Sequence, residues 1–281
     1  MMGTSVRNPA VAGKFYPRSA AELDQVVAGL LTRASTRLQD VSGLPDAANR
    51  TAGTVRAVIA PHAGYMFSGS IAALSFAAAA QYRDAPPRRV ILLGPAHYAA
   101  GITVALPQAD SFRTPLGDHP VDGEAMQRLL QTGLAETNGA AHSAEHSLEV
   151  MLPFIMAVWG ALPILPLLCS RIAPERLAEI LVEEIGPGDL LVVSSDLSHF
   201  HPAATAEQLD NALLEAWEQG DPHGVSQGEA CGKLPILASM ALARQQGWRH
   251  RVLGYAHSGA AGIGSESVVG YGAGMYYASS E

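Results

Sequence analysis

Short apolar runs recur along the chain, most of them far enough apart for one helix to lie between them, and this spacing limits the fold more than any other feature of the sequence. Runs rich in Val, Ile and Leu that are bounded by Gly, Pro or polar turns predict strands. Several runs contain almost no polar residue, which is typical of strands covered on both faces. The predicted strands are residues 56–60, 89–93, 102–105, 164–168, 190–194, 251–255 and 268–277.

Apolar residues at three- and four-residue spacing predict helices in most of the segments between these runs. The predicted helices are residues 20–34, 70–82, 123–131, 147–159, 174–185, 205–218 and 234–246. Alternating strands and helices predict an α/β fold with a largely parallel or mixed central sheet and helices on both faces. We expect a single domain over residues 1–281, with a mobile loop at residues 39–54.

The composition indicates a compact protein that does not bind nucleic acid. Charged residues make up 16% of the chain and hydrophobic residues 48%. The net charge is -8 and the 18 Lys and Arg are scattered, so no basic stripe would attract a phosphate backbone. The first residues lack the charged-then-apolar layout of a signal peptide, and two cysteines imply no disulfide framework. We therefore expect a cytoplasmic protein.

One uncharged stretch, residues 150–169, is long enough to cross a bilayer. Pro153, Gly160, Pro163 and Pro166 interrupt it. Because proline cannot sit inside a regular helix without breaking it, we expect a helix entered near Pro153 and then a buried strand. We predict no membrane association for this stretch.

Three of the apolar runs end in loops that carry histidine. "VIAPHAGY" gives His62, "VILLGPAHY" gives His97, and "LLVVSSDLSHFH" gives Asp196, His199 and His201. In open α/β sheets, ligands bind in the crevice beyond the carboxyl ends of the strands. Three such loops from neighbouring parallel strands would therefore meet at one pocket.

A metal held by protein side chains usually needs at least three ligands, so two imidazoles require a third group. "ACGKLPI" offers Cys231, just before a predicted helix. We expect the positive end of the helix dipole and nearby Lys233 to lower the pKa of this thiol and favour the thiolate, the form that binds metal. Cys169, inside an apolar strand, is interpreted as a small buried hydrophobe.

The segment "HSAEHSLEVMLPF" allows two interpretations. Its first five residues fit the H-x-x-E-H pattern of inverted zinc peptidases, with His142 and His146 as ligands and Glu145 as base. That pattern needs a single helix, whereas the two serines look like helix starts and the apolar periodicity begins only after them. We favour the second interpretation, in which Glu145 and His146 lie in a loop and their side chains point into the same pocket as His62. Four histidines are expected at the surface: His119, His142, His223 and His250.

The sequence segments that contain these residues resemble the Memo family, including the prokaryotic branch usually called AmmeMemoRadiSam system protein B. The match covers nearly the whole chain, in eight blocks that follow the family's order: "NPAVAGKFYP", "APHAGYMFSGS", "LLGPAHY", "FRTPLGD", "EHSLEVMLPF", "VVSSDLSHF", "CGKLPI" and "VGYGAGMYY". Eight ordered blocks are a specific signal.

The resemblance implies a fold similar to class III extradiol ring-cleaving dioxygenases, whose active site holds non-haem iron. In Memo-like proteins the metal ligands would fall here on His62, His97 and Cys231. The dioxygenases use a carboxylate in the third place, and a thiolate there softens the site toward copper, zinc or a more electron-rich iron. Ring cleavage therefore does not follow from the fold. The remaining polar wall of the pocket would consist of Asp196, His199, Glu145 and His146.

Two functions follow as hypotheses. The first is a metal-binding oxidoreductase acting on an unknown small molecule, with one metal ion, iron(II) as the expected ion and copper or zinc as alternatives. Its acid–base group would be His199, hydrogen-bonded by Asp196 or lying beside it. The second is a non-catalytic adaptor that recognises a peptide or partner protein through the same pocket. The branch's name also implies work beside a radical-SAM protein and an AMMECR-type protein.

Overall fold

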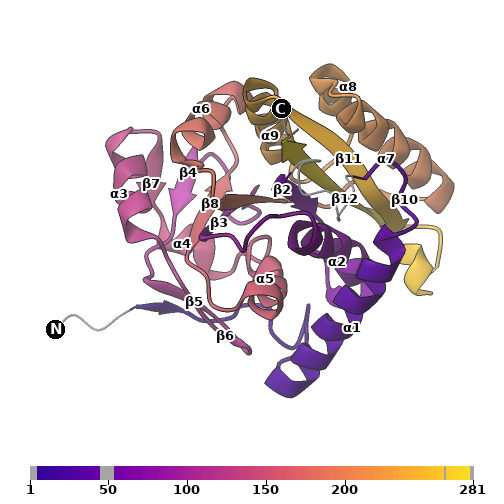
Figure 1. The fold of residues 1–281 in the computed structure, drawn as a ribbon, viewed down its shortest axis with the longest axis horizontal. Coiled ribbons are helices and arrows are strands. Elements are labelled where there is room, and N and C mark those ends of the chain that lie inside the picture. Colours follow the sequence, from indigo (N-terminus) through magenta and orange to yellow (C-terminus); the bar gives the residue numbers. More distant parts are fainter. Residues whose placement is uncertain (1–4, 45–53, 263, 279–281) are drawn as a thin grey trace.

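The structure is a computed structural model that describes residues 5–44, 54–262 and 264–278. Within them, nine strands form one mixed sheet through the centre of the molecule (Figure 1). They are β2 (Val55–Ala60), β3 (Arg89–Pro95), β4 (Val104–Leu106), β7 (Ala135–Thr137), β8 (Ile164–Cys169), β9 (Asp189–Ser194), β10 (His199–His201), β11 (Trp248–His257) and β12 (Val268–Ala278). Their order is β10-β12-β2-β9-β3-β8-β4-β7, and β11 pairs with β12.

The middle of this sheet is parallel. β2, β9, β3 and β8 lie side by side and run in the same direction, whereas β12 is antiparallel to β2 and β4 is antiparallel to β8. The ends of β2, β3 and β9 at Ala60, Pro95 and Ser194 therefore meet, and we call this end of the sheet its carboxyl edge. All seven predicted strands belong to this sheet, which confirms the mixed α/β prediction.

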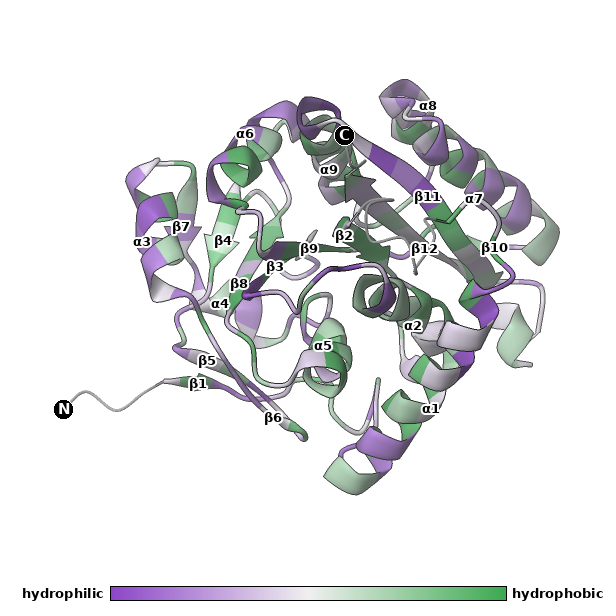
Figure 2. Cartoon of the chain, viewed as in Figure 1, coloured by the Kyte–Doolittle hydropathy of each residue, from purple (hydrophilic) through white to green (hydrophobic). Residues whose placement is uncertain are grey.

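Helices cover both faces of the sheet, also as predicted. α1 (Ala20–Leu38), α2 (Tyr65–Gln81) and α5 (Leu152–Trp159) pack in one core, and α3 (Gly123–Gln131), α6 (Pro174–Glu184) and α9 (Lys233–Gln246) pack in the other. Successive residues of a strand pack into the two cores in turn: Val58 and Leu92 face the first core, and Ile59 and Ile91 face the second. Figure 2 shows hydrophobic residues concentrated on the central strands. The other helices are α4 (Gly139–Ser143), α7 (Ala203–Glu218) and α8 (Pro222–Gln227).

Two predicted helix starts are wrong. α2 begins at Tyr65 and not at residue 70, because the Gly64 carbonyl already accepts bonds from the amides of Phe67 and Ser68. The helix predicted over residues 147–159 opens as a 3-10 turn, Glu149–Met151, and becomes α-helical only at Leu152, with a proline in its first turn. Proline fits the first turn of a helix because its missing N–H would have no partner there.

A second, three-stranded sheet was not predicted. It contains β1 (Val6–Arg7), β5 (Ser111–Thr114) and β6 (Gly117–Pro120), with β5 paired to both neighbours. Its hairpin carries an exposed Arg113–Asp118 ion pair. Strands this short and polar have no apolar run to reveal them.

The uncharged stretch at residues 150–169 divides as expected, into the end of a 3-10 turn, α5 and the buried strand β8. Across residues 5–44, 54–262 and 264–278, no helix has both the length and the apolar character needed to cross a membrane. Most of the loop predicted at residues 39–54 lies outside the described residues, which stop at 44 and resume at 54.

Candidate metal centre

The histidine-bearing loops meet at the carboxyl edge of the sheet. His62 follows β2, His97 follows β3, and both lie near His146 from the loop after α4. The imidazole centroids of His62 and His97 are 5.2 Å apart, and His146 lies 5.4 Å from the first and 4.7 Å from the second. The structure thus brings together three rings that are far apart in the sequence.

Cys231 completes a group of three possible metal ligands. One ligand atom from each of His62, His97 and Cys231 lies within 4.8 Å of the others. The Cys231 sulfur is 3.3 Å from Nε2 of His62. The thiol is held in place by the Asp196 backbone, whose N–H lies 3.2 Å from the sulfur and whose carbonyl accepts from the Cys231 amide.

The His62 side chain is fixed from the side away from Cys231. Its Nδ1 lies 2.6 Å from Oγ of Ser194, the last residue of β9, and its backbone N–H donates to Asp196 over 2.7 Å. The ring is 2% exposed, and burial together with His97 and His146 holds the pKa of His62 well below its usual value. The imidazole is therefore neutral at physiological pH.

His97 is fixed by a carboxylate. Glu145 Oε1 lies 2.9 Å from Nδ1 of His97, and Oε2 accepts the His97 backbone N–H over 2.6 Å. Against the effect of burial, the bonds from His97 and from the Ser147 amide lower the pKa of Glu145 to about 2. The carboxylate is ionised and can only accept, so Nδ1 carries the hydrogen and Nε2 of His97 has a free lone pair.

A second group with metal-type side chains, His97, Glu145 and His146, has ligand atoms equally close together. Its carboxylate is already engaged: Oε1 also accepts the amides of His146 and Ser147 over 2.8 and 2.9 Å, and Oε2 is taken by His97. We therefore interpret Glu145 as the support of His97. The first group, with two imidazole nitrogens and a sulfur, fits the donor preferences of iron, copper and zinc.

His146 packs beside the two candidate histidine ligands. Its ring stacks on His97 and packs edge-on against Phe15 at 4.9 Å. Nδ1 is buried and lies 3.3 Å from Glu145 Oε1, but the geometry does not make a hydrogen bond. Glu145 and His146 lie in a loop, as predicted, because α4 ends at Ser143. The single helix that a zinc-peptidase pattern needs is therefore not present here.

The expected effect of Lys233 on Cys231 is wrong. The Lys233 ammonium donates to the carbonyls of Ser226 and Gly228, at the end of α8, so its charge is directed there. Burial dominates at the thiol and, with the Asp196 carboxylate, raises the pKa of Cys231 to about 12. The nearby amides oppose this shift without reversing it.

Asp196 and His199 are not a hydrogen-bonded pair. The Asp196 carboxylate turns back toward β2 and accepts the backbone N–H groups of His62 and Ala63, while burial raises the pKa of Asp196 to about 7. His199 is half-buried and bonds to the Leu197 backbone; burial lowers its pKa. His199 therefore stands as a separate neutral imidazole beside the pocket.

Glycines permit two close approaches at this edge. A Cβ atom on Gly232 would lie 2.5 Å from the Ser194 carbonyl oxygen, and one on Gly94 would lie 2.7 Å from Leu148. Gly64, in contrast, would place a Cβ no closer than 3.5 Å to any atom. Gly232 thus lets the Cys231 turn lie directly on the end of β9.

Sequence reasoning missed an ionic clamp behind the pocket. Arg7 forms an ion pair with Glu149, at side-chain exposures of 7% and 0%, and also donates to the carbonyl of Glu145. Glu149 further accepts the amides of Ala10 and Val11. The segment at residues 7–16 therefore holds the loop that carries Glu145. Nothing in the block "NPAVAGKFYP" itself indicates these contacts.

Two histidines expected at the surface are buried. His119 is fully enclosed, and both ring nitrogens face carbonyls, of Leu162 and Leu152. His142 is 2% exposed and its Nε2 lies 2.9 Å from the carbonyl of Ala105. Both imidazoles therefore bond to the backbone inside the protein.

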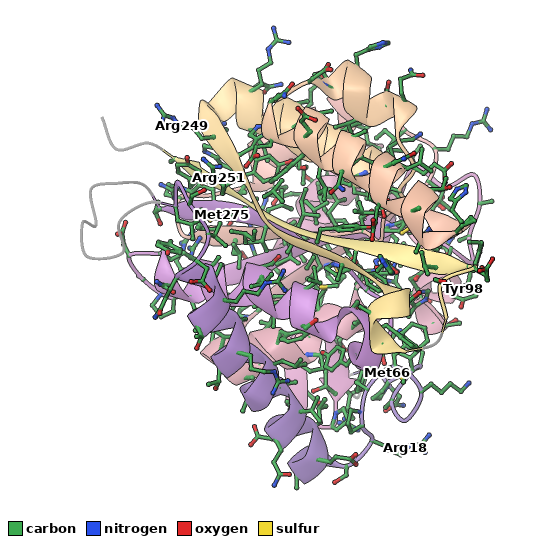
Figure 3. The ribbon with its side chains drawn as sticks, turned by 90° about the vertical axis from the view of Figure 1, so that its right-hand side faces the viewer. Arg18, Met66, Tyr98, Arg249, Arg251 and Met275 are labelled. Carbon is green, nitrogen blue, oxygen red and sulfur yellow. The ribbon has the colours of Figure 1, made fainter. Side chains whose placement is uncertain are left out.

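Three large apolar side chains are exposed near the histidines in the chain. Met66, Tyr98 and Phe200 are 73%, 64% and 75% exposed, and each follows a pocket histidine within four residues. Figure 3 shows Met66 and Tyr98 at the same side of the molecule. Phe200 has φ 63°, a left-handed conformation that is strained for a bulky residue.

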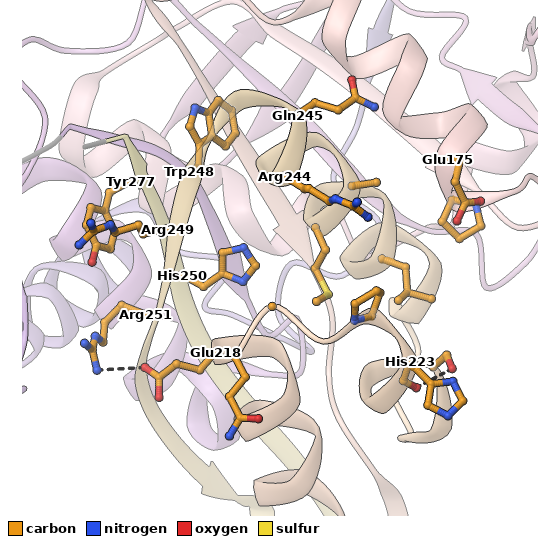
Figure 4. Close-up of a pocket in the computed structure, with 18 residues that line it drawn as sticks. Glu175, Glu218, His223, Arg244, Gln245, Trp248, Arg249, His250, Arg251 and Tyr277 are labelled. Atoms are coloured by element: carbon orange, nitrogen blue, oxygen red, sulfur yellow. Dashed lines mark hydrogen bonds and ion pairs between the residues drawn. The ribbon is translucent and has the colours of Figure 1, made fainter. Parts of the chain in front are cut away.

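A cavity of about 1160 Å³ is lined by residues of α6, α7, α8, α9, β11 and β12 (Figure 4). Its wall includes Arg244 of α9, Trp248 and His250 of β11, and Tyr277, which pairs with the first residue of β2. Neither group of metal-type side chains found among the described residues includes a residue of this cavity. The cavity is therefore separate from the candidate centre.

A family model and several individual proteins of the same family match nearly the whole chain. A family model described as "Memo-like protein" matches residues 7–275. A MEMO1 family protein of Aeropyrum pernix is 37% identical over 282 residues, covering 95% of this chain and 98% of its own length. One from Ignicoccus hospitalis is 32% identical and covers 95% and 97%, and one from Thermotoga maritima is 33% identical and covers 77% and 78%.

Proposed function

The chain belongs to the Memo family, and we propose that it is a metal-binding protein in which His62, His97 and Cys231 hold one ion. Iron(II) is the expected ion, with copper and zinc as alternatives. The observation that carries the proposal is the convergence of the three ligand atoms within 4.8 Å of one another at the carboxyl edge. Both imidazoles are supported through Nδ1, an arrangement typical of metal-ligating histidines.

We propose further that the pocket acts as an oxidoreductase on a small molecule. When bound, a redox-active ion supplies the electron-transfer chemistry that side chains lack. Glu145 and Asp196 orient the site, the first through His97 and the second through the His62 backbone. His199 accepts a proton from the substrate, because its imidazole is neutral and only half-buried beside His97. His146 and Phe15 exclude water from one side.

Metal content tests the first proposal. Protein purified without chelator should carry iron, copper or zinc, and Cys231→Ala should lose most of it. His199→Ala is the matched control, because it removes a pocket imidazole outside the ligand group, and it should keep the metal. A protein that takes up none of the three metals would refute the proposal, and equal loss in both variants would mean that the ligand group is wrongly assigned.

Oxygen consumption tests the second proposal. The iron-loaded protein would be given a panel of catechols and other dihydroxy aromatics in an oxygen electrode. Sustained uptake in the wild type that falls strongly in His199→Ala, with metal content unchanged, is the expected result. Oxygen uptake that is the same in His199→Ala as in the wild type would refute the proposal that His199 accepts the substrate's proton.

A binding or adaptor function is favoured by a different observation. Met66, Tyr98 and Phe200 expose large apolar side chains, each within four residues of His62, His97 or His199. Exposed apolar groups are typical of surfaces that contact a peptide or partner protein. Replacing Tyr98 with serine should then weaken partner capture while leaving metal content unchanged.

A further inference from the structure

Ser194 links His62 to the loop that supports His97. Its hydroxyl is fully buried at the end of β9, 2.6 Å from Nδ1 of His62 on one side and 2.6 Å from the Ser147 carbonyl on the other. Ser147 is fixed in turn, because its hydroxyl donates to the Pro95 carbonyl over 3.0 Å and its amide donates to Glu145. The Ser194 hydroxyl therefore connects the His62 imidazole to the Ser147 carbonyl, whose position is fixed by its own hydrogen bonds.

The hydrogens of this chain of bonds can be assigned by counting. A carbonyl oxygen only accepts, so the single hydroxyl hydrogen of Ser194 goes to Ser147. The oxygen of Ser194 is then left to accept from His62, which requires the hydrogen on Nδ1. Nε2 of His62 keeps its lone pair, and it faces the sulfur of Cys231 at 3.3 Å.

We propose that Ser194 is a positioning residue that fixes His62 in the Nδ1–H tautomer and so directs the Nε2 lone pair into the ligand group. The inference rests on the proposed metal function, since the tautomer matters because Nε2 is a ligand. Neutral imidazole has two tautomers, and the bond made by one ring nitrogen decides the state of the other. Glu145 performs the same task for His97, so two different groups prepare the two histidines alike.

A matched control is available in Ser239. It is also buried, at 1% exposure, and its hydroxyl also has two partners, the Ile236 carbonyl and the Tyr276 hydroxyl. Alanine at Ser194 or Ser239 should therefore lower the urea midpoint of unfolding to a similar extent, because each removes a buried hydroxyl with two partners. Only Ser194→Ala should change the tautomer of the His62 imidazole.

The test combines two readouts. Nitrogen NMR of ¹⁵N-histidine-labelled, chelator-treated protein reports the tautomer directly: His62 should be Nδ1–H in the wild type and in Ser239→Ala, and should shift toward Nε2–H in Ser194→Ala. Titration with cobalt(II), followed by the sulfur-to-cobalt absorption band, should show affinity about 10- to 100-fold weaker in Ser194→Ala, the usual cost of losing a supporting bond, and little changed in Ser239→Ala.

The two proposals fail in different ways. Wild-type protein with His62 in the Nε2–H tautomer would overturn the role of Ser194 without any variant. An unchanged tautomer and unchanged cobalt affinity in Ser194→Ala would overturn it as well. If the wild type binds neither cobalt nor any other metal while the tautomer still depends on Ser194, the metal function fails and the hydrogen-bond assignment stands.

Discussion

Replacing Glu149 with glutamine should lower the free energy of unfolding by about 3 to 5 kcal/mol, the cost of removing one partner from a buried ion pair. The two Glu149 oxygens accept from the Arg7 guanidinium, the amides of Ala10 and Val11 at 2.8 and 3.0 Å, and the Tyr16 hydroxyl at 2.6 Å. Glutamine has the same shape but turns one acceptor into an NH₂ group facing donors. It also leaves Arg7 buried without a counter-charge.

Urea unfolding followed by tryptophan fluorescence measures this loss. The control is Glu179→Gln, which breaks an exposed ion pair with Arg176 at 54% exposure on both sides. That change should stay within about 0.5 kcal/mol, because exposed pairs contribute little. A loss below about 1 kcal/mol in Glu149→Gln, comparable to the control, would refute the view that this clamp stabilises the fold.

Three further predictions concern pH, packing and strain. Burial lowers the pKa of His142 to about 4, so its imidazole stays neutral in the folded protein, whereas the unfolded chain takes up a proton below about pH 6.5. As the pH falls through this range, His142 alone should remove up to about 3 kcal/mol from the free energy of unfolding. Urea unfolding across pH should therefore show a fall in the wild type that is smaller by about that amount in His142→Gln. Gly232→Ala should cost about 1 to 3 kcal/mol through backbone overlap, whereas Gly64→Ala should be tolerated, as measured by thermal unfolding. Phe200→Gly should be about 1 kcal/mol more stable than Phe200→Ala in urea, because only glycine relieves the left-handed φ; equal midpoints would contradict the strain.

The positions of His62 and His97 could be predicted because they depend on a local rule. Each follows an apolar run that becomes a central parallel strand, and parallel neighbours end at the same edge. The direction of the Asp196 side chain could not be predicted in this way. Asp196 and His199 are three residues apart in the segment after β9. This spacing does not decide whether the Asp196 carboxylate turns to His199 or, as observed, to the backbone N–H of His62.

The supports of the centre depend on contacts between distant segments. Nothing near Ser194 indicates that its hydroxyl bonds to Ser147, and nothing near Arg7 indicates Glu149. The pKa of Cys231 differs from the sequence-based expectation for a related reason. A helix start and a nearby lysine are visible in the sequence, whereas the burial that outweighs them arises only when Cys231 packs on the end of β9.

The clamp between Arg7 and Glu149 also bears on the order of folding. The two residues are 142 positions apart, so their contact closes a very long loop. Contacts of large sequence separation carry a high entropic cost and slow folding. The pairing of β2 with β12 spans an even longer stretch of chain, so sequence separation alone does not rank the two events. The partner of Arg7, however, lies in the 3-10 turn Glu149–Met151, whose residues Val150 and Met151 belong to the core. We therefore expect the segment at residues 7–16 to dock only after that turn has packed in the core. Until it docks, the loop that supports His97 lacks its contacts with Arg7, and the geometry of the proposed ligand group should form in a later kinetic phase than the core.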